Sequence, residues 1–190
     1  MGDVTEPRAD RSIADLPEGG TVAPVPDGPV LVVTAHPDDV DFGMAGTIAA
    51  WRGAGVEVTY CIVTNGDAGG FDATVSRSDM AQLRQHEQRA AAAAVGVERV
   101  EFLGHPDGRV TVSLELRREL SRVIRQLRPA VVLTQSPERN FERIFASHPD
   151  HLAVGEATLC AVYPDARNQF AHPELFAEGL DEHEIGRAHV

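Results

Sequence analysis

The chain contains no lysine, so all 17 of its basic residues are arginines. This absence excludes a Schiff-base lysine and the lysine of a phosphate-binding P-loop. Basic residues are also outnumbered by the 29 acidic residues, which gives a formal net charge of -12. Because binding to phosphates needs a basic surface, this balance disfavours nucleic acid as a partner and disfavours an anionic membrane surface.

Cysteines and long apolar runs are scarce as well. The two cysteines, Cys61 and Cys160, indicate no disulfide framework, and we interpret both as buried, unreactive thiols. The first residues lack the apolar stretch of a signal peptide, and no apolar run approaches the roughly 20 residues that span a bilayer. We therefore expect a cytoplasmic protein without integral membrane association. The oligomeric state stays open.

Strand-like and helix-like segments alternate through the 190 residues, a length that fits one domain. Apolar runs predict strands at 30–34, 56–64, 99–103 and 130–135. Amphipathic stretches predict helices at 43–54, 78–95, 112–127 and 149–162. The alternation predicts an α/β fold, a Rossmann-like three-layer sandwich with a mainly parallel sheet. Ligands collect at the carboxyl ends of such strands, so the loops that follow the strands are the places to search.

The ends of the chain are set apart from this domain, which we expect over residues 28–183. Residues 1–27 are rich in proline, glycine and acidic residues, a composition typical of a flexible tail. Residues 184–190 resemble the translation of a sequencing adapter, and we interpret them as a spurious tail.

Three of the loops carry a His-Pro-Asp element, and in two of them, within Ala35–Asp39 and within Ser147–His151, a second candidate metal ligand follows it, whereas His105-Pro-Asp107 has none nearby. Proline and an acidic residue are both favoured in the first turn of a helix, so each element alone is explained as a good helix start. Together they place at one sheet edge a group of polar side chains, namely His36, Asp38, Asp39, His148, Asp150 and His151. Two histidines and one carboxylate with an open position form a typical catalytic zinc shell, although Fe²⁺ takes the same ligands. A spare carboxylate beside the metal can serve as the base for a water molecule.

These paired motifs resemble those of the LmbE-like (PIG-L) de-N-acetylases, and the resemblance runs from about Val30 to Val162. Supporting positions are Gly46-Thr47, Thr64-Asn-Gly-Asp67 and Leu103-Gly104. The resemblance implies a zinc-dependent hydrolase that removes an acetyl group from a small molecule or glycoconjugate containing N-acetylglucosamine. It implies one Zn²⁺ per chain and an N-acetylated sugar conjugate as the partner.

The resemblance also implies roles for individual residues. His36, Asp39 and His151 become the metal ligands, and Asp38 becomes the general base. His148 becomes the group that stabilises the oxyanion or protonates the leaving amine. Arg84 and Asp107 match positions that hold the sugar. For Asp150 we prefer a helix cap over the alternative of orienting His148.

The chain departs from the family pattern in two places. Val40 stands where the commonest motif has glutamate, which affects the identity of the substrate more than metal binding. The family continues with further strands after the fourth helix, so we expect the domain to be truncated at its C-terminus.

Other functions stay open at this point. A metallophosphoesterase would need a second metal, for which Asp41 and Asp67 are the available carboxylates. A non-catalytic metal-binding fragment would use the same histidines. A dinucleotide site is disfavoured, because no Gly-x-Gly-x-x-Gly follows the first strand.

Overall fold

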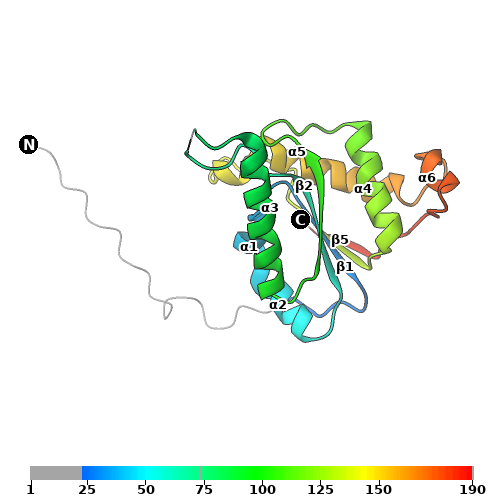
Figure 1. The fold of residues 1–190 in the computed structure, drawn as a ribbon. Coiled ribbons are helices and arrows are strands. Elements are labelled where there is room, and N and C mark those ends of the chain that lie inside the picture. The colour runs from blue at the N-terminus through cyan, green and yellow to red at the C-terminus, as the bar shows by residue number, and fades with distance from the viewer. Residues whose placement is uncertain (1–22, 73, 190) are drawn as a thin grey trace, which may run out of the picture.

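Apolar, β-branched runs form the strands at the centre of the molecule. In the computed structural model, which describes residues 23–72 and 74–189, five strands pair in the order β3-β2-β1-β4-β5, and every pairing is parallel (Figure 1). The strands are β1 Val30–Thr34, β2 Val58–Thr64, β3 Arg99–His105, β4 Val131–Leu133 and β5 Arg187–His189. The predicted parallel α/β fold is confirmed. Of the expected tail 1–27, residues 1–22 lie outside the described residues.

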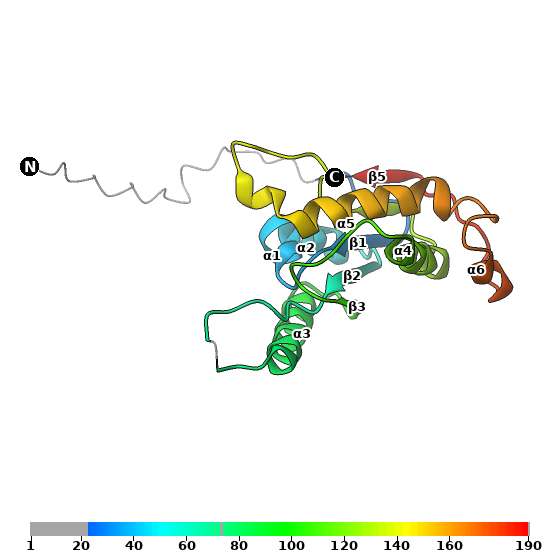
Figure 2. The same ribbon diagram turned by 90° about the horizontal axis from the view of Figure 1, so that it is seen from above.

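Helices cover both faces of this sheet, which makes the molecule a three-layer sandwich (Figure 2). The strand β1 is buried along its whole length, and its successive side chains point to opposite faces. Leu31 and Val33 pack with α4 (Leu114–Leu127) and α5 (Pro149–Cys160). Val30 and Val32 pack on the other face, whose helices are α1 (Asp39–Gly43), α2 (Ala45–Gly53) and α3 (Arg77–Ala94).

Helix starts follow the capping chemistry of the sequence, with small shifts from the predicted positions. The helix expected at 78–95 begins one residue earlier, as α3, and Ser76 caps it by accepting the N–H of Asp79 at 3.1 Å. Ser113 caps α4 in the same way. The helix expected at 43–54 begins earlier, at Asp39, and is interrupted at Met44, so that it forms α1 and α2.

The C-terminal part of the chain packs against α4. It comprises the π-helical turn η3 (Ala161–Asp165) and α6 (Pro173–Ala177). Arg125 of α4 is 2% exposed and donates to five backbone carbonyl groups between Asp165 and Leu180, at 2.9–3.3 Å. A buried guanidinium therefore stabilises this irregular segment through its backbone.

The segment 184–190 was set apart from the domain by its sequence. In the structure, Arg187–His189 of this segment form β5, paired with Val131–Leu133 of β4. Strand pairing uses backbone N–H and C=O groups, which any sequence supplies, and this explains why the side chains did not indicate it. Val40, the departure from the family motif, is fully buried in the core beside α2.

The two cysteines differ from each other. Cys61 is buried and its pKa is raised by burial, as expected for an unreactive thiol, whereas Cys160 is only partly buried. Within the described residues, no helix combines the length and the apolar character that a membrane crossing requires.

Candidate metal centre

The turn after β1 places His36 and Asp39 side by side. Asp39 is the first residue of α1, and its Oδ2 accepts the backbone N–H of His36 at 2.7 Å. The turn is tied to the neighbouring strand end because Gln135, which follows β4, accepts the N–H of Ala35 at 2.9 Å. The hydrogen bond within this turn therefore orients the carboxylate of Asp39 without a bound ligand.

The second His-Pro-Asp element begins α5. After β4 the chain runs through a short 3-10 helix, η2 (Ile144–Ser147), to His148 at the N-cap and Pro149 at the first helical position. The Nδ1 atom of His148 accepts the N–H of Asp150 at 3.2 Å. This places His151 in the first turn of α5, next to the turn after β1.

Two histidine nitrogens and both oxygens of the Asp39 carboxylate, all from these two turns, lie close together. His36 Nδ1 lies 3.2 Å from His151 Nε2, His151 Nε2 lies 3.1 Å from Asp39 Oδ1, and His36 Nδ1 lies 3.5 Å from Asp39 Oδ2. A tetrahedral ion with bonds of about 2.1 Å separates its ligand atoms by about 3.4 Å. The spacing and the donor types therefore fit a small divalent cation such as zinc. The structure brings together the three residues that the resemblance implied as ligands.

The other nitrogen of His36 faces two further carboxylates. His36 Nε2 lies 3.1 Å from Asp150 Oδ2 and 3.2 Å from Asp107 Oδ1. Asp150 is fully buried and also accepts the backbone N–H groups of Gly108 and Val110, at 2.7 and 3.1 Å. The interpretation of Asp150 as a helix cap was wrong, because His148 is the cap. A carboxylate that accepts from one ring nitrogen leaves the other free for a metal, as is usual for histidine ligands.

These surroundings set the charge of the metal-free centre. Burial opposes a protonated His36, but the hydrogen bond and charge of Asp39, with contributions from Asp107 and Asp150, raise its pKa to about 9. Burial also opposes a charged Asp39, but hydrogen bonds with His151 and His36 outweigh it and hold the pKa of Asp39 well below its usual range. Without a metal, the centre therefore holds a proton on His36, which a bound cation would displace.

His148 lies beside the two ligand histidines. Its ring centroid is 4.8 Å from that of His36 and 5.3 Å from that of His151. His36, His148 and His151 form a group whose donor atoms lie within 4.8 Å of one another, and His36, Asp107 and Asp150 form another. Burial, followed by the charge of His36, lowers the pKa of His148. Since its Nδ1 accepts a hydrogen bond, the neutral ring carries its proton on Nε2.

Asp38 stands beside these groups with a left-handed backbone, at φ 98°. Its carboxylate pairs with Arg84 Nη2 at 2.5 Å, and 43% of its side chain is exposed. Burial raises the pKa of Asp38, while the charge of Arg84 acts in the opposite direction. Asp38 is thus a partly exposed carboxylate, adjacent in the chain to the candidate ligand Asp39.

The two expected sugar-binding residues lie at this centre, where other residues already contact them. Arg84 donates to Asp38, to the carbonyl of Pro37 at 2.9 Å and to Glu87 at 3.1 Å. The backbone N–H of Asp107 donates to Asp67 Oδ1 at 2.8 Å, and Asp67 in turn pairs with Arg77.

Sequence reasoning missed two glutamines at this site. Gln135 fixes the turn before His36, and Gln88 of α3 contacts Asp38 and Asp41. Gln88 lies four residues after Arg84, on the same side of the helix, and this spacing was the signal that could have found it. Gln135 lies two residues after the end of β4, and its place near a strand end was a weaker signal.

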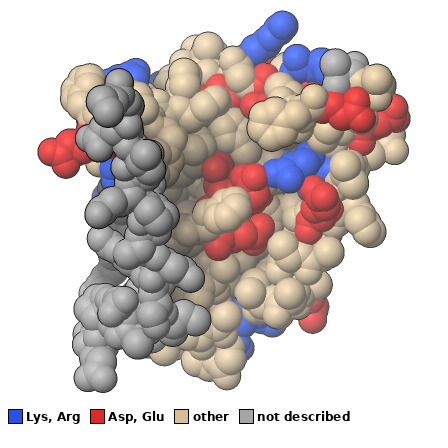
Figure 3. All heavy atoms as spheres, turned by 90° about the vertical axis from the view of Figure 1, so that its left-hand side faces the viewer, with Lys and Arg blue, Asp and Glu red and all other residues tan. Residues whose placement is uncertain are grey.

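A large cavity opens from the centre. Its volume is about 1230 Å³, and Asp39 and His151 contribute to its wall. Most of the remaining wall is apolar or aromatic, including Phe42, Trp51 and Phe145. On the face drawn in Figure 3, acidic side chains gather near the middle with arginine beside them, in keeping with a net charge of -12.

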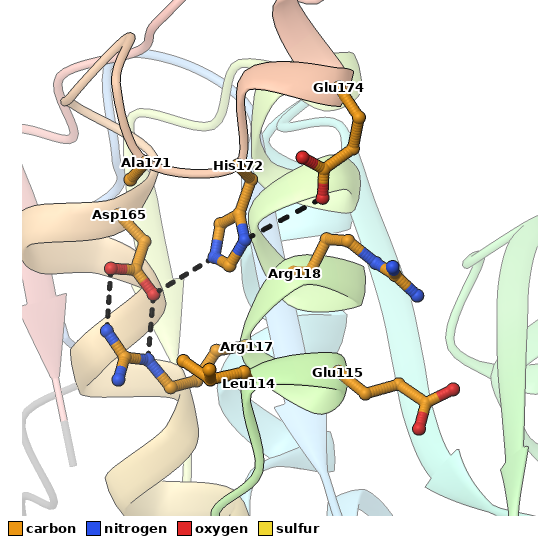
Figure 4. A pocket seen from close by; sticks show the side chains of 8 residues that line it. All are labelled: Leu114, Glu115, Arg117, Arg118, Asp165, Ala171, His172 and Glu174. Carbon is orange, nitrogen blue, oxygen red and sulfur yellow. Dashed lines mark hydrogen bonds and ion pairs between the residues drawn. The ribbon is translucent and has the colours of Figure 1, made fainter.

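A second hollow of about 650 Å³ lies between α4 and α6 (Figure 4). Three of its polar groups form a network: Arg117 forms two hydrogen bonds to Asp165, at 2.7 and 2.8 Å, and His172 lies 3.4 Å from Asp165. His172 is mostly buried here, with 13% of its side chain exposed. This network packs the C-terminal segment onto α4 and contributes no group to the candidate centre.

Comparison with known proteins gives a consistent result. The family model described as "PIG-L: GlcNAc-PI de-N-acetylase" matches residues 31–162. Diacetylchitobiose deacetylase of Thermococcus kodakarensis is 35% identical over 156 residues, covering 82% of this chain and 57% of that protein. The protein named "Probable N-acetyl-alpha-D-glucosaminyl L-malate deacetylase 2" of Bacillus anthracis is 32% identical over 168 residues, covering 85% of this chain and 71% of that one.

A solved structure is also similar. N,N'-diacetylchitobiose deacetylase from Pyrococcus horikoshii superposes with a TM-score of 0.78 at 30% identity, covering 83% of this chain and 57% of that one. The chain thus spans little more than half the length of the two diacetylchitobiose deacetylases.

Proposed function

The chain belongs to the PIG-L family of de-N-acetylases, and from this premise we propose that it is a zinc-dependent hydrolase. The proposed reaction removes the acetyl group from a small molecule or glycoconjugate that contains N-acetylglucosamine. The observation that carries the proposal is the meeting of His36, Asp39 and His151 donor atoms at 3.1–3.5 Å. The names of the similar proteins support the substrate class, since they describe deacetylases of N-acetylated sugars.

Each residue of the centre has a separate role in the proposed amide hydrolysis. A zinc ion bound by His36, Asp39 and His151 would polarise the acetyl carbonyl and make a water molecule more acidic. Asp38 is placed to take the proton of the attacking water, and Arg84 keeps its carboxylate in position. His148 can donate its Nε2–H to the developing oxyanion, because its Nδ1 is occupied by the N–H of Asp150.

The leaving amine must receive a proton, since an amide anion is too poor a leaving group. Asp38, once protonated, and His148 are the two groups placed to supply it. Arg84 and Asp107 remain the proposed contacts for the sugar. Asp107 has an exposed fraction of 14% for its side chain and lies beside the ligand His36, so a bound sugar near the metal would meet it.

The alternative of a phosphoesterase with two metals finds less support. The two carboxylates that the sequence offered for a second ion have other partners: Asp41 accepts from Gln88 at 3.4 Å, and Asp67 pairs with Arg77 at 2.6 Å. Iron(II) suits the same three ligands as zinc, and metal analysis of the purified protein distinguishes the two. A cytoplasmic location stays a prediction from the composition.

An amine-release assay against a panel of N-acetylglucosamine conjugates tests the proposal. We expect amine and acetate in equal amounts, loss of activity with a chelator and recovery on adding zinc. A chain that binds one zinc and releases no amine from any member of the panel would instead be a non-catalytic metal-binding protein.

A further inference from the structure

Gln88 is a buried polar residue of α3 that contacts the backbone of Asp38. It is 2% exposed, and its Oε1 accepts the backbone N–H of Asp38 at 2.5 Å. The two residues are 50 positions apart in the sequence, so the contact joins α3 to the turn after β1. A buried side-chain amide that accepts a backbone N–H from another element restrains that element.

The backbone of Asp38 needs such a restraint. Its φ of 98° lies in the left-handed region, which residues with a side chain rarely adopt. Conformations of this kind cost about 1–3 kcal/mol and persist only where the surroundings hold them. Asp38 is the N-cap residue of α1, and its side chain forms no capping hydrogen bond. The hydrogen bond that holds its backbone N–H comes from Gln88, which lies outside the turn.

A second contact fixes the direction of the Gln88 amide. Its Nε2 donates to Asp41 Oδ2 at 3.4 Å, which leaves Oε1 facing the N–H of Asp38. The reverse orientation would place two donors against each other at Asp38 and two acceptors against each other at Asp41. Asp41 therefore determines which end of the amide meets Asp38.

Arg84 acts from the same side of α3, one helical turn before Gln88. Its Nη2 holds the carboxylate of Asp38 at 2.5 Å and the carbonyl of Pro37 at 2.9 Å. One face of α3 thus holds Asp38 at two points, the backbone by Gln88 and the carboxylate by Arg84.

We propose that Gln88 is a positioning residue for catalysis, which holds the backbone of Asp38 so that its carboxylate faces the attacking water. The inference rests on the proposed function, in which Asp38 is the base. Gln88 acts through Asp38 and Asp41 and does not contact the donor atoms of the metal centre.

The test replaces Gln88 by methionine, which keeps the volume and removes both hydrogen bonds. The matched control is Gln85→Met on the same helix, because Gln85 donates to Asn65 at 2.7 Å and has no contact with Asp38. Two quantities are measured on the zinc-loaded chains: hydrogen exchange of the Asp38 amide by NMR, and kcat with KM. We expect Gln88→Met to raise the exchange rate of that amide at least ~10-fold and to lower kcat ~10- to 100-fold, with little change in KM or zinc content.

A double variant tests the hydrogen-bond pattern itself. Gln88→Glu alone keeps an acceptor for Asp38 but places a carboxylate against Asp41. Adding Asp41→Asn supplies a donor in place of that acceptor and leaves the net charge unchanged. We expect the double variant to recover at least half of the kcat lost in Gln88→Glu, and to restore slow exchange of the Asp38 amide.

The results separate this inference from the proposed function. Equal exchange of the Asp38 amide in wild type and Gln88→Met overturns the inference, as does faster exchange with a kcat equal to that of the Gln85→Met control. If wild type releases no amine from any substrate, the proposed function has failed. Amide exchange then decides by itself whether Gln88 fixes Asp38.

Discussion

At the scale of single residues, the centre depends on side chains that are held before any ligand arrives. Asp39 accepts the N–H of His36 in its own turn, and Asp150 contacts the far nitrogen of His36. Asp38 differs from both because it is partly exposed and pairs with an arginine. The three aspartates thus differ in their surroundings, which supports three separate proposed tasks, as ligand, as support of a ligand and as base.

Replacing Asp38 by asparagine tests its task. Asparagine tolerates the left-handed backbone, so the turn should survive, but it cannot take a proton. We expect kcat to fall ~10²- to 10⁴-fold while zinc content stays at one per chain. The measurement is steady-state kinetics with metal analysis of the same samples. Loss of zinc in stoichiometric amount would reassign Asp38 as a ligand.

The proton on His36 gives the metal-free protein a pH dependence. The pKa of His36 is raised from its ordinary value of 6.5 to about 9 in the folded chain. A raised folded-state pKa stabilises the folded chain fully below about pH 6.5, and this stabilisation is lost as the pH rises through about 9. We expect the melting temperature of chelator-treated wild type to fall between pH 6.5 and pH 9.5 by more than that of His36→Asn. Parallel pH profiles for the two proteins would contradict the assignment.

At the scale of elements, α5 carries the second His-Pro-Asp element and packs very closely against the residues that follow β4. This packing brings the second element next to the first. A Cβ atom at Gly155 would lie 2.2 Å from the carbonyl oxygen of Gln135 and 3.0 Å from the backbone nitrogen of Pro137. Only glycine permits this approach, and Gln135 is the residue that fixes the turn before His36. The position of α5, and with it that of His148 and His151, therefore depends on one glycine.

Gly155→Ala should push α5 away from β4. We expect the free energy of unfolding to fall by ~1–3 kcal/mol and zinc affinity to fall several-fold, because two side chains of the centre move with the helix. The control is Gly53→Ala in α2, where a Cβ meets nothing within 4 Å and no loss of stability is expected. Denaturant unfolding of both variants, with zinc and with chelator, is the measurement. A Gly155→Ala protein as stable as wild type would show that the close contact does not position the helix.

Some features of these elements could be predicted from the sequence, and others could not. The two His-Pro-Asp elements could be placed at one sheet edge because each lies in the connection from a predicted strand to the next helix, and parallel strands end at the same edge. Gln88 and Gly155 could not be assigned in this way, since their contacts join segments that only the folded chain brings together. Asp150 was misinterpreted for a related reason: its partners include Gly108 and Val110, in a loop that the sequence separates from it by 40 residues or more.

At the scale of the whole molecule, the sheet and its two helical layers position the centre, and the rest of the chain stabilises that frame. The paired groups between α4 and α6 and the buried Arg125 pack the C-terminal segment onto the frame. Family membership extends over residues 31–162, which include every residue proposed to act in the reaction. The strand β5 lies outside this range and contains none of these residues.

The most direct test of the central claim is a zinc titration of the chelator-treated chain, followed by the initial rate of amine release from an N-acetylglucosamine conjugate. If His36, Asp39 and His151 hold a single catalytic ion, the rate rises in proportion to added zinc and stops rising at one equivalent per chain. A rate that needs a second equivalent, or no amine release at any zinc concentration, would contradict the account.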